Sequence, residues 1–324
     1  MKCIKLIIII FALIAIAGCS NKSGNEKLTI AVIPKGSTHE FWKAIHAGAL
    51  DASEEENVDI IWKGPVKEDD REDQIQTVES FISAGVDAIV LAPLDDRALF
   101  IPVRDAKAAG IPTVIVDSAL DGSEHISFVA TDNFHGGVLG AELVGELLGN
   151  TGKLIMVRCM EGAASSTKRE EGFITTIRSQ FPGITVLSDN QYGGITTESS
   201  YRTCENLLNR FDDVDAIFTP NESTTFGCLR ALQDYGLAGK VYFVGFDSSD
   251  KLIQALKVGE LNGLVVQNPY RMGYDGVKTA VAHMKGQPYE KWIDTGVHMV
   301  TKETLNNLEI QKLLHHTVTM PGDE

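Results

Sequence analysis

Short apolar runs alternate along this chain with longer segments in which apolar residues recur every three or four positions. The longer segments have the spacing of helices that pack on a sheet, as Ile75, Val78, Phe81 and Ile82 illustrate. Strands that alternate with helices in this way form parallel sheets covered by helices, so the pattern predicts an α/β fold. The expected strands lie at 28–34, 58–62, 87–92, 112–117, 126–130, 153–158, 184–188, 214–219, 240–246 and 262–267.

Two short motifs of the first half of the chain return in the second half at nearly the same separation. The sequence VDAI at 86–89 returns roughly 130 residues later, and VDS around Asp117 returns at a similar separation as FDS around Asp247. Two matches in register indicate a duplicated α/β domain. Because ligands bind beyond the carboxyl ends of strands in open α/β sheets, two facing sheets would place Asp117 and Asp247 on opposite walls of one cleft.

The N-terminal residues have the pattern of a secretion signal. Two lysines precede the apolar run 6–17, and Cys19 and several polar residues follow this run. The run is shorter than the about 20 residues that a membrane-spanning helix needs. Its ending resembles the bacterial lipoprotein signal, in which the cysteine thiol is acylated. We therefore expect a signal peptide at 1–18, a lipid anchor on Cys19 and a tether at 19–27; the alternative is an ordinary signal peptide with an incidental cysteine.

The charge of the chain argues against nucleic acid as a partner. It has 29 Lys and Arg residues against 44 Asp and Glu residues, a formal net charge of −15, and loss of the signal peptide removes two of the lysines. A surface of this sign repels phosphate backbones. With 44% hydrophobic residues the chain can still build a sizeable core.

Motifs of catalysis, cofactor binding and metal binding are missing from the sequence. Residues 135–140 do not give a dinucleotide-binding G-x-G-x-x-G, and the patterns of phosphate-binding loops, zinc proteases and serine hydrolases do not occur. The cysteines beyond the N-terminal segment are Cys159, Cys204 and Cys228, an odd number without metal-ligand spacing. We expect buried reduced thiols, no cofactor, no metal and no enzymatic activity.

Polar and aromatic side chains follow several of the expected strands. Carboxylates, amides and a guanidinium can form paired hydrogen bonds to neighbouring hydroxyl groups, and aromatic faces suit the C–H faces of a sugar ring. These residue types predict a neutral, hydroxyl-rich ligand. The candidates are Lys35, His39, Phe41, Trp42, Asp95, Asp117, Arg169, Tyr192, Asn221, Glu222, Asp247 and Gln267.

Each of the main candidates also has a structural interpretation. Asp117 and Asp247 could cap the helices that follow them, and Asn221 could be a turn residue. Arg169 stands in the sequence KREE, which could be a solvated helix face. These alternatives stay open at this point.

The residues at the start of the first expected helix also have a structural interpretation. Ser37 and Glu40 have the spacing of a capping box. Phe41 and Trp42 could both be core residues, although adjacent helix residues cannot both face one core, so at least one of them points elsewhere. The charged run 67–73 is interpreted as a solvated helix start.

Several stretches, in order and at the proper spacing, resemble the periplasmic sugar-binding proteins of ABC importers, the group typified by ribose-binding protein. The resemblance covers nearly all of residues 28–300. The stretches are FW at 41–42, GIPTVIVDSA, ATDNFHGG, REEGF, DAIFTPNE, VYFVGFDSS and LVVQNPYRMG.

The resemblance implies a type I periplasmic binding fold: two Rossmann-like domains with parallel sheets, joined by three crossings near 131, 267 and 296. An N-terminal lobe would comprise 28–131 and 268–296, and a C-terminal lobe would comprise 132–267 and 297–324. Ligand contacts carried over from the family fall on Phe41 and Trp42, which would stack, and on Asp117, Arg169, Asn221, Phe246, Asp247 and Gln267.

This chain also departs from the ribose pattern. Ribose binders have Asn-Pro where this chain has His39 and Glu40, and an arginine where it has Ser118; Ala92 replaces an asparagine. Lys35 resembles a ligand-contacting lysine of the branch that binds autoinducer-2 and rhamnose. Lys35 and His39 are therefore added to the expected ligand-binding residues.

The resemblance implies a lipid-anchored solute-binding protein at the periplasmic or extracytoplasmic face. It would bind a monosaccharide or related polyol between two closing lobes and deliver it to an ABC permease. A sensor that presents the ligand to a chemoreceptor or kinase would share the pocket. Two further alternatives are a repressor core and a cleft enzyme. A repressor core would need an N-terminal DNA-binding helix pair in place of the signal peptide, and an enzyme would turn over the sugar that it binds.

Overall fold

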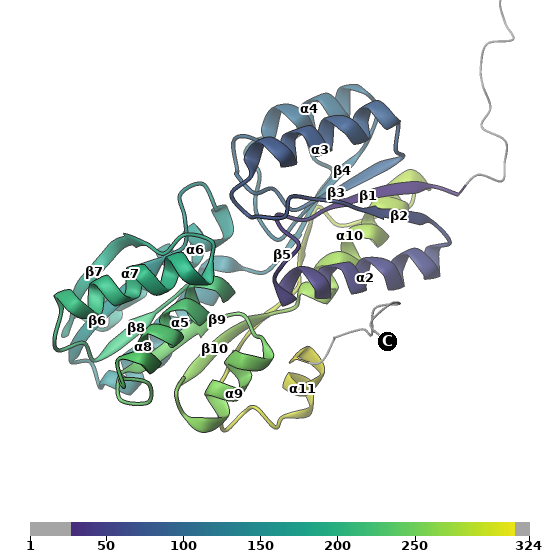
Figure 1. The fold of residues 1–324 in the computed structure, drawn as a ribbon. Helices are drawn as coiled ribbons and strands as arrows, with labels where there is room; N and C mark the ends of the chain where they lie inside the picture. The colour runs from purple at the N-terminus through teal and green to yellow at the C-terminus, as the bar shows by residue number, and fades with distance from the viewer. Residues whose placement is uncertain (1–26, 315–324) are drawn as a thin grey trace, which may run out of the picture.

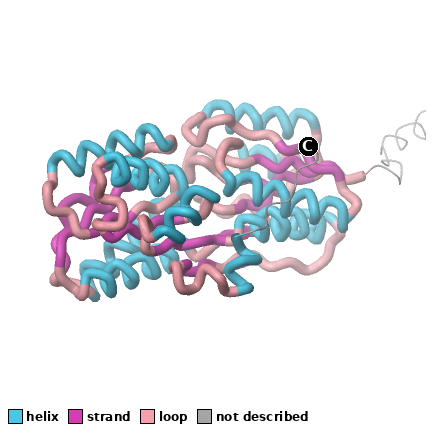
Figure 2. Tube along the Cα trace, turned by 60° about the horizontal axis from the view of Figure 1, so that its bottom comes forward, coloured by secondary structure: helices cyan, strands magenta, loops and turns pink. Residues whose placement is uncertain are grey.

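The structure is a computed structural model that describes residues 27–314. Within these residues the chain forms two lobes, each built around a six-stranded sheet. In Figure 1 the lobe at the upper right holds the first strands and the lobe at the lower left holds the middle of the chain. Figure 2 shows in each lobe a layer of strands between helices. The predicted α/β architecture is confirmed.

The N-terminal lobe contains an all-parallel sheet in the order β11-β5-β4-β3-β1-β2. Apolar side chains on both faces of this sheet are covered by helices, with α2 and α10 on one face and α3 and α4 on the other (Figure 1). The elements are β1 (Thr29–Ile33), α2 (Glu40–Glu56), β2 (Asp59–Trp62), α3 (Arg71–Ala84), β3 (Ala88–Leu91), α4 (Phe100–Ala108), β4 (Thr113–Val116), β5 (Ser127–Ala130), α10 (Pro269–Met284) and β11 (Trp292–Asp294).

The C-terminal lobe repeats the plan with the sheet order β12-β10-β9-β8-β6-β7, in which β12 alone pairs antiparallel within the described residues. Helices α5 and α6 cover one face, and α7, α8, α9 and α11 cover the other. The elements are α5 (Asn133–Leu148), β6 (Gly152–Arg158), α6 (Ala164–Gln180), β7 (Ile184–Tyr192), α7 (Thr197–Arg210), β8 (Ala216–Phe218), α8 (Glu222–Asp234), β9 (Tyr242–Phe246), α9 (Asp250–Val258), β10 (Gly263–Gln267), β12 (Val297–Val300) and α11 (Leu308–Leu314).

In the part of the chain that the structure describes, the backbone passes between the sheets three times: after β5, after β10 and between β11 and β12. The first and third passages lie side by side. The Thr131 hydroxyl of the first passage donates to the Gly296 carbonyl oxygen of the third at 3.1 Å. Movement of one lobe relative to the other must be absorbed at these connections.

Glycines allow the helices that cover one face of each sheet to touch backbone to backbone. A Cβ atom on Gly48 of α2 would lie 2.0 Å from the Tyr270 carbonyl oxygen of α10, and one on Gly137 of α5 would lie 2.0 Å from the Arg169 carbonyl oxygen of α6. The second contact fixes the depth of α6, and with it the position of Arg169 at the boundary between the lobes.

The edge strands β11 and β12 are absent from the sequence prediction. They have only three and four residues, and most of these side chains are partly or fully exposed. Such short segments lack the continuous apolar run that marks a buried strand.

The predicted capping box at the start of α2 is wrong. The helix begins at Glu40, the N-cap position is His39, and no side chain caps it. Glu40 is thus the first residue of the helix and not the third, and its carboxylate pairs with Lys43 at 3.0 Å.

Residues 27–314 include no helix with the length and apolarity needed to span a membrane. Cys159, Cys204 and Cys228 are free and buried, as expected. Cys19 and the predicted signal peptide lie outside the described residues.

Candidate functional site

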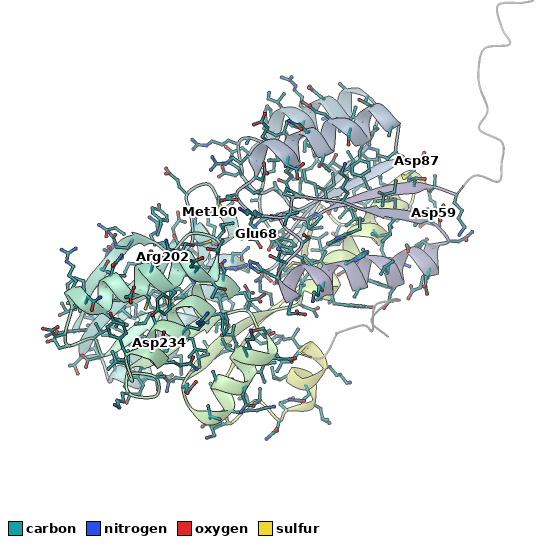
Figure 3. The ribbon with its side chains drawn as sticks, in the orientation of Figure 1. Asp59, Glu68, Asp87, Met160, Arg202 and Asp234 are labelled. Carbon is teal, nitrogen blue, oxygen red and sulfur yellow. The ribbon has the colours of Figure 1, made fainter. Side chains whose placement is uncertain are left out.

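Nearly all predicted site residues line one cavity of about 40 Å³ between the lobes. Glu68 and Met160, labelled in Figure 3 where the two lobes meet, also line it. The predicted residues at this cavity are Lys35, His39, Phe41, Trp42, Asp117, Arg169, Asn221, Glu222, Asp247 and Gln267. The lining residues that were not among the sequence candidates are Glu68, Leu94, Cys159, Met160, Ala163, Ser165, Ser166 and Ile195.

Lys35 connects the two lobes at one side of this cavity. It is 6% exposed, and its Nζ atom lies 2.6 Å from Asp117 Oδ2 and donates to Ser118 Oγ at 2.6 Å. The same atom donates at 3.3 Å to the hydroxyl of Ser165, which belongs to α6 of the other lobe. The hydroxyl groups of Ser118 and Ser165 lie 2.9 Å apart. Lys35 is therefore the centre of a hydrogen-bond network, in which a hydroxyl group of a ligand could take the place of a serine hydroxyl.

Arg169 lies between two carboxylates from different lobes. Its terminal nitrogen atoms are 4.0 Å from Asp117 Oδ1 and 3.9 Å from Asp247 Oδ2. Its Nε atom donates to Asn133 Oδ1 at 2.7 Å, which fixes the plane of the guanidinium. Because Arg169 is 3% exposed, its interpretation as part of a solvated helix face is wrong.

Phe246 lies behind Arg169 and not at the cavity. Its side chain is completely buried, and the guanidinium carbon of Arg169 lies 4.2 Å from the ring centroid. A cation over an aromatic face is stabilised electrostatically, and the ring also limits the rotation of the guanidinium. Phe246 thus positions Arg169, although the family pattern implied direct ligand contact.

Both carboxylate oxygen atoms of Asp247 accept hydrogen bonds within the C-terminal lobe. Its Oδ1 accepts from Gln267 Nε2 at 2.7 Å, and its Oδ2 accepts from the Glu222 backbone N–H at 3.1 Å. Burial raises the pKa of Asp247, and the nearby Arg169 charge opposes this.

The interpretation of the aspartates as caps of the following helices is wrong. The N-cap of α9 is Ser249, and the N-cap of α5 is Asp132. Asn221, in contrast, does cap α8: its side chain accepts from the Thr224 backbone N–H at 3.3 Å. Asn221 therefore combines its structural interpretation with a place at the cavity.

His39, Glu68 and Trp42 form a second polar cluster on the N-terminal lobe. Glu68 Oε1 lies 2.7 Å from His39 Nδ1 and accepts from Trp42 Nε1 at 2.6 Å. Burial lowers the pKa of His39, but the hydrogen bond and charge of Glu68 outweigh this and raise it to about 9. Burial raises the pKa of Glu68, but the hydrogen bonds from His39 and Trp42 and the charge of His39 lower this pKa below its ordinary value. Both groups are charged at neutral pH.

The two aromatic residues of α2 lie in different environments. Trp42 is 3% exposed and belongs to the core beneath the sheet, with its indole N–H directed to Glu68. Phe41 is partly exposed and packs edge-on against Trp42, with ring centroids 5.0 Å apart. The expectation that the pair cannot share one environment agrees with this arrangement.

Glu68 is a site residue that sequence reasoning missed. The charged run 67–73 is not a solvated helix start throughout, because α3 begins at Arg71 with Asp70 as its N-cap. The side chain of Glu68 is 14% exposed, whereas Glu72 in the same run is exposed. Nothing in the run distinguishes the two carboxylates until the fold brings α2 beside them.

Two of the initial strand-end candidates lie apart from the cavity. Asp95 accepts hydrogen bonds from the backbone N–H groups of Arg97 and Ala98 and pairs with Arg71. Tyr192 is 41% exposed and packs under Arg158.

Two buried acceptor atoms at the cavity lack a hydrogen-bond partner, namely Glu222 Oε2 and Gln267 Oε1. An unsatisfied buried polar group costs about 1–3 kcal/mol. Burial also raises the pKa of Glu222 to about 7. A ligand that brings hydroxyl donors to these two atoms would recover this cost.

The thiol of Cys159 lines the cavity together with these polar groups. Burial raises the pKa of the Cys159 thiol to about 12, so it is protonated and a poor nucleophile at neutral pH. Residues 27–314 contain no group of three or more His, Cys, Asp or Glu side chains that could hold a metal ion.

The cavity is small with the lobes placed as they are in this structure. About 40 Å³ is room for roughly three water molecules. The contacts of Ser118 and Lys35 with Ser165 close the space between the lobes directly.

The chain is similar in sequence to known binding proteins. It matches the periplasmic binding protein domain over residues 30–288. It is 25% identical to the ribose import binding protein RbsB of Bacillus subtilis, covering 94% of this chain and 100% of that protein. It is 31% identical to the D-ribose/D-allose-binding protein of Pseudomonas aeruginosa, covering 85% of this chain and 89% of that protein.

Solved structures give the same picture. A carbohydrate transporter solute-binding protein of Agrobacterium radiobacter in complex with D-arabinose is similar, with a TM-score of 0.86 and 32% identity, covering 90% of this chain and 99% of that one. A solute-binding protein of Agrobacterium vitis with bound D-fucose has a TM-score of 0.86 and 34% identity, covering 89% and 100%.

Proposed function

This chain belongs to the periplasmic binding protein domain family and is ribose-binding-protein-like, and on that premise we propose that it binds a monosaccharide or related polyol for an ABC importer. The ligand would lie between the lobes and pass to a membrane permease. The named import and transport functions of the relatives support this proposal.

The position of Arg169 between Asp117 and Asp247 is the observation that carries the proposal. One donor group and two acceptor groups, from both lobes, converge on one small cavity. A sugar hydroxyl both donates and accepts, so neighbouring hydroxyls could bridge these groups, and hydrogen bonds to charged groups contribute about 1.5–3 kcal/mol each.

A neutral ligand fits the charges of the site. Lys35 and Arg169 face Asp117, and the protonated His39 faces Glu68. A ligand with a net charge would have to displace one of these pairs and leave a buried charge without its partner. Hydroxyl groups can exchange with protein hydrogen bonds without this cost.

We propose that the lobes divide at the three connections near residues 131, 267 and 296 and close on the ligand there. Closure would be favoured only by the contacts that the ligand makes in the closed state. The direct ligand contacts would come from Lys35, His39, Phe41, Trp42, Asp117, Arg169, Asn221, Asp247 and Gln267.

We further propose that Cys19 carries a lipid anchor and holds the protein at the extracytoplasmic face of a membrane. The sequence pattern before this residue supports the proposal. Mass spectrometry of the protein purified from a bacterial membrane would test it, because cleavage before an acylated Cys19 gives a defined mass, and a Cys19→Ala variant should lose the lipid.

A thermal unfolding screen tests the proposed function. The probes are D-ribose, D-allose, D-arabinose, D-fucose, D-tagatose and xylitol. A true ligand at one hundred times its dissociation constant should stabilise the protein by about 2.7 kcal/mol. The expected result is a clear shift with at least one of them. No shift with any sugar or polyol would overturn the proposal.

A further inference from the structure

A second and larger cavity adjoins the proposed sugar cavity. It has a volume of about 640 Å³ and lies between the lobes, against α8, α9, α10 and α11. His39, Phe41, Glu222, Asp247 and Gln267 line both cavities, so they form a shared wall. Pockets for small molecules are typically about 300–1,000 Å³, so the second cavity is large enough for a ligand group of its own.

The shared wall contains both unpartnered acceptors of the site. Glu222 Oε2 and Gln267 Oε1 are buried without a hydrogen-bond partner. Gln267 is 2% exposed; its Nε2 atom donates to Asp247, and its Oε1 atom is the buried oxygen without a partner. Hydroxyl groups at the boundary between the two cavities, which both donate and accept, could partner both oxygen atoms. Both atoms belong to residues that line both cavities, so a ligand that continues from the first cavity into the second would carry hydroxyl groups past both of them.

Beyond the wall the second cavity offers apolar surface with a polar rim. Phe226 comes from α8, Ile253 from α9 and Leu313 from α11, and each contributes apolar atoms. Lys251 lines the same space, with its Nζ atom 4.9 Å from the centroid of the Phe226 ring. An apolar face beside polar groups is complementary to a ring that has C–H or aromatic faces and a polar edge.

We propose that the second cavity is a subsite for a second ring, so that the protein prefers a glycoside over the free monosaccharide. The first ring would lie at Asp117 and Arg169. The glycosidic bond would pass between Glu222 and Gln267, and the second ring would pack between Phe226, Ile253 and Leu313. This inference rests on the proposed function, because it needs the first ring to bind as a sugar.

The test compares each free sugar of the panel with its methyl glycoside, its 4-nitrophenyl glycoside and a disaccharide that has the same sugar at its non-reducing end. Dissociation constants are measured by isothermal titration calorimetry. For at least one sugar, the 4-nitrophenyl glycoside or the disaccharide should bind at least tenfold more tightly than the methyl glycoside, which reaches the wall but does not fill the space behind it.

A variant that fills the second cavity tests whether the tenfold preference arises there. Ala44 lines the second cavity and not the first, on a partly exposed turn of α2. Ala44→Phe should remove the tenfold preference while the dissociation constant of the free sugar changes less than twofold. Leu313→Ser, near the end of the described chain, should reduce the preference without loss of fold. Glu54→Phe places the same aromatic ring on an exposed position of α2 and is the matched control.

The outcomes separate the two proposals. If free sugars bind and every two-ring probe binds more weakly than the methyl glycoside, the subsite is wrong and the proposed function stands. A preference that survives Ala44→Phe would also overturn the subsite. If no sugar or glycoside binds, the proposed function fails, and the subsite fails with it.

Discussion

Asp117 and Asp247 share a left-handed backbone conformation, with φ angles of 62° and 66°, although they lie in different lobes. Each is the first residue after a buried strand, β4 or β9. For residues other than glycine this conformation costs about 1–3 kcal/mol and persists only where the surroundings impose it. Both carboxylates lie about 4 Å from the Arg169 guanidinium, at 4.0 and 3.9 Å. The duplicated strand ends therefore aim two acidic groups at one cation.

Replacement of Asp247 by asparagine should weaken ligand binding about ten- to hundredfold, which corresponds to one charge-assisted hydrogen bond. Asparagine tolerates the left-handed backbone, so the fold should be retained. Calorimetry with the best sugar of the panel measures the change. Asp212→Asn, at an exposed loop position, is the control. Unchanged affinity in Asp247→Asn would show that this carboxylate does not contact the ligand.

The His39–Glu68 pair predicts a loss of stability at alkaline pH. The folded-state pKa of His39 is about 9, above the ordinary value of 6.5. The stabilisation is therefore fully present below pH 6.5 and is lost as the pH rises through about 9. A rise of this size corresponds to about 3 kcal/mol. Urea unfolding at pH 7 and pH 10 measures it.

The His39→Gln variant should lose most of that pH-dependent difference, because glutamine cannot take up the proton. His298→Gln, at an exposed histidine, should keep the wild-type profile. A His39→Gln profile that matches the wild type would mean that another group titrates over this range.

The strand ends were predictable because they follow from local sequence. The repeat of VDAI and the matching positions of Asp117 and Asp247 predict two α/β domains whose strands end at equivalent positions. Glu68 and Ser165 were not predictable in this way. Each lies in a segment without a distinctive pattern, and each reaches the cavity only because a second element packs beside it: Trp42 for Glu68, and Ser118 of the opposite lobe for Ser165.

The role of Phe246 shows a further limit of sequence reasoning. Its position directly before Asp247 is visible in the sequence, but whether its ring meets the ligand or supports Arg169 depends on the direction of alternate side chains along β9. The strand directs this ring to the α5 side of the sheet, where it meets Gly136 and the guanidinium.

Gly137→Ala should destabilise the C-terminal lobe by about 3 kcal/mol, at the upper end of the usual cost of overpacking. The new methyl group would lie 2.0 Å from the Arg169 carbonyl oxygen, a backbone atom that cannot move without α6. Thermal or urea unfolding measures the loss, and Glu146→Ala on the exposed side of α5 is the control. A loss below 1 kcal/mol would show that α5 and α6 can separate easily. Any remaining folded protein should also bind sugar more weakly, since α6 carries Arg169.

The contact between Ser118 and Ser165 allows a direct test of lobe opening. Their hydroxyl oxygens lie 2.9 Å apart across the boundary between the lobes, so cysteines at both positions should be able to form a disulfide. The native thiols Cys159, Cys204 and Cys228 are buried and should not compete. In the oxidised double variant the lobes cannot separate around a cavity of about 40 Å³, so sugar binding should fall at least a hundredfold. Reduction with dithiothreitol should restore the affinity of the reduced protein, and the Ser118→Cys single variant should be insensitive to oxidation. If the disulfide forms and the oxidised protein still binds sugar as the reduced protein does, the ligand enters by a route that does not need the lobes to open.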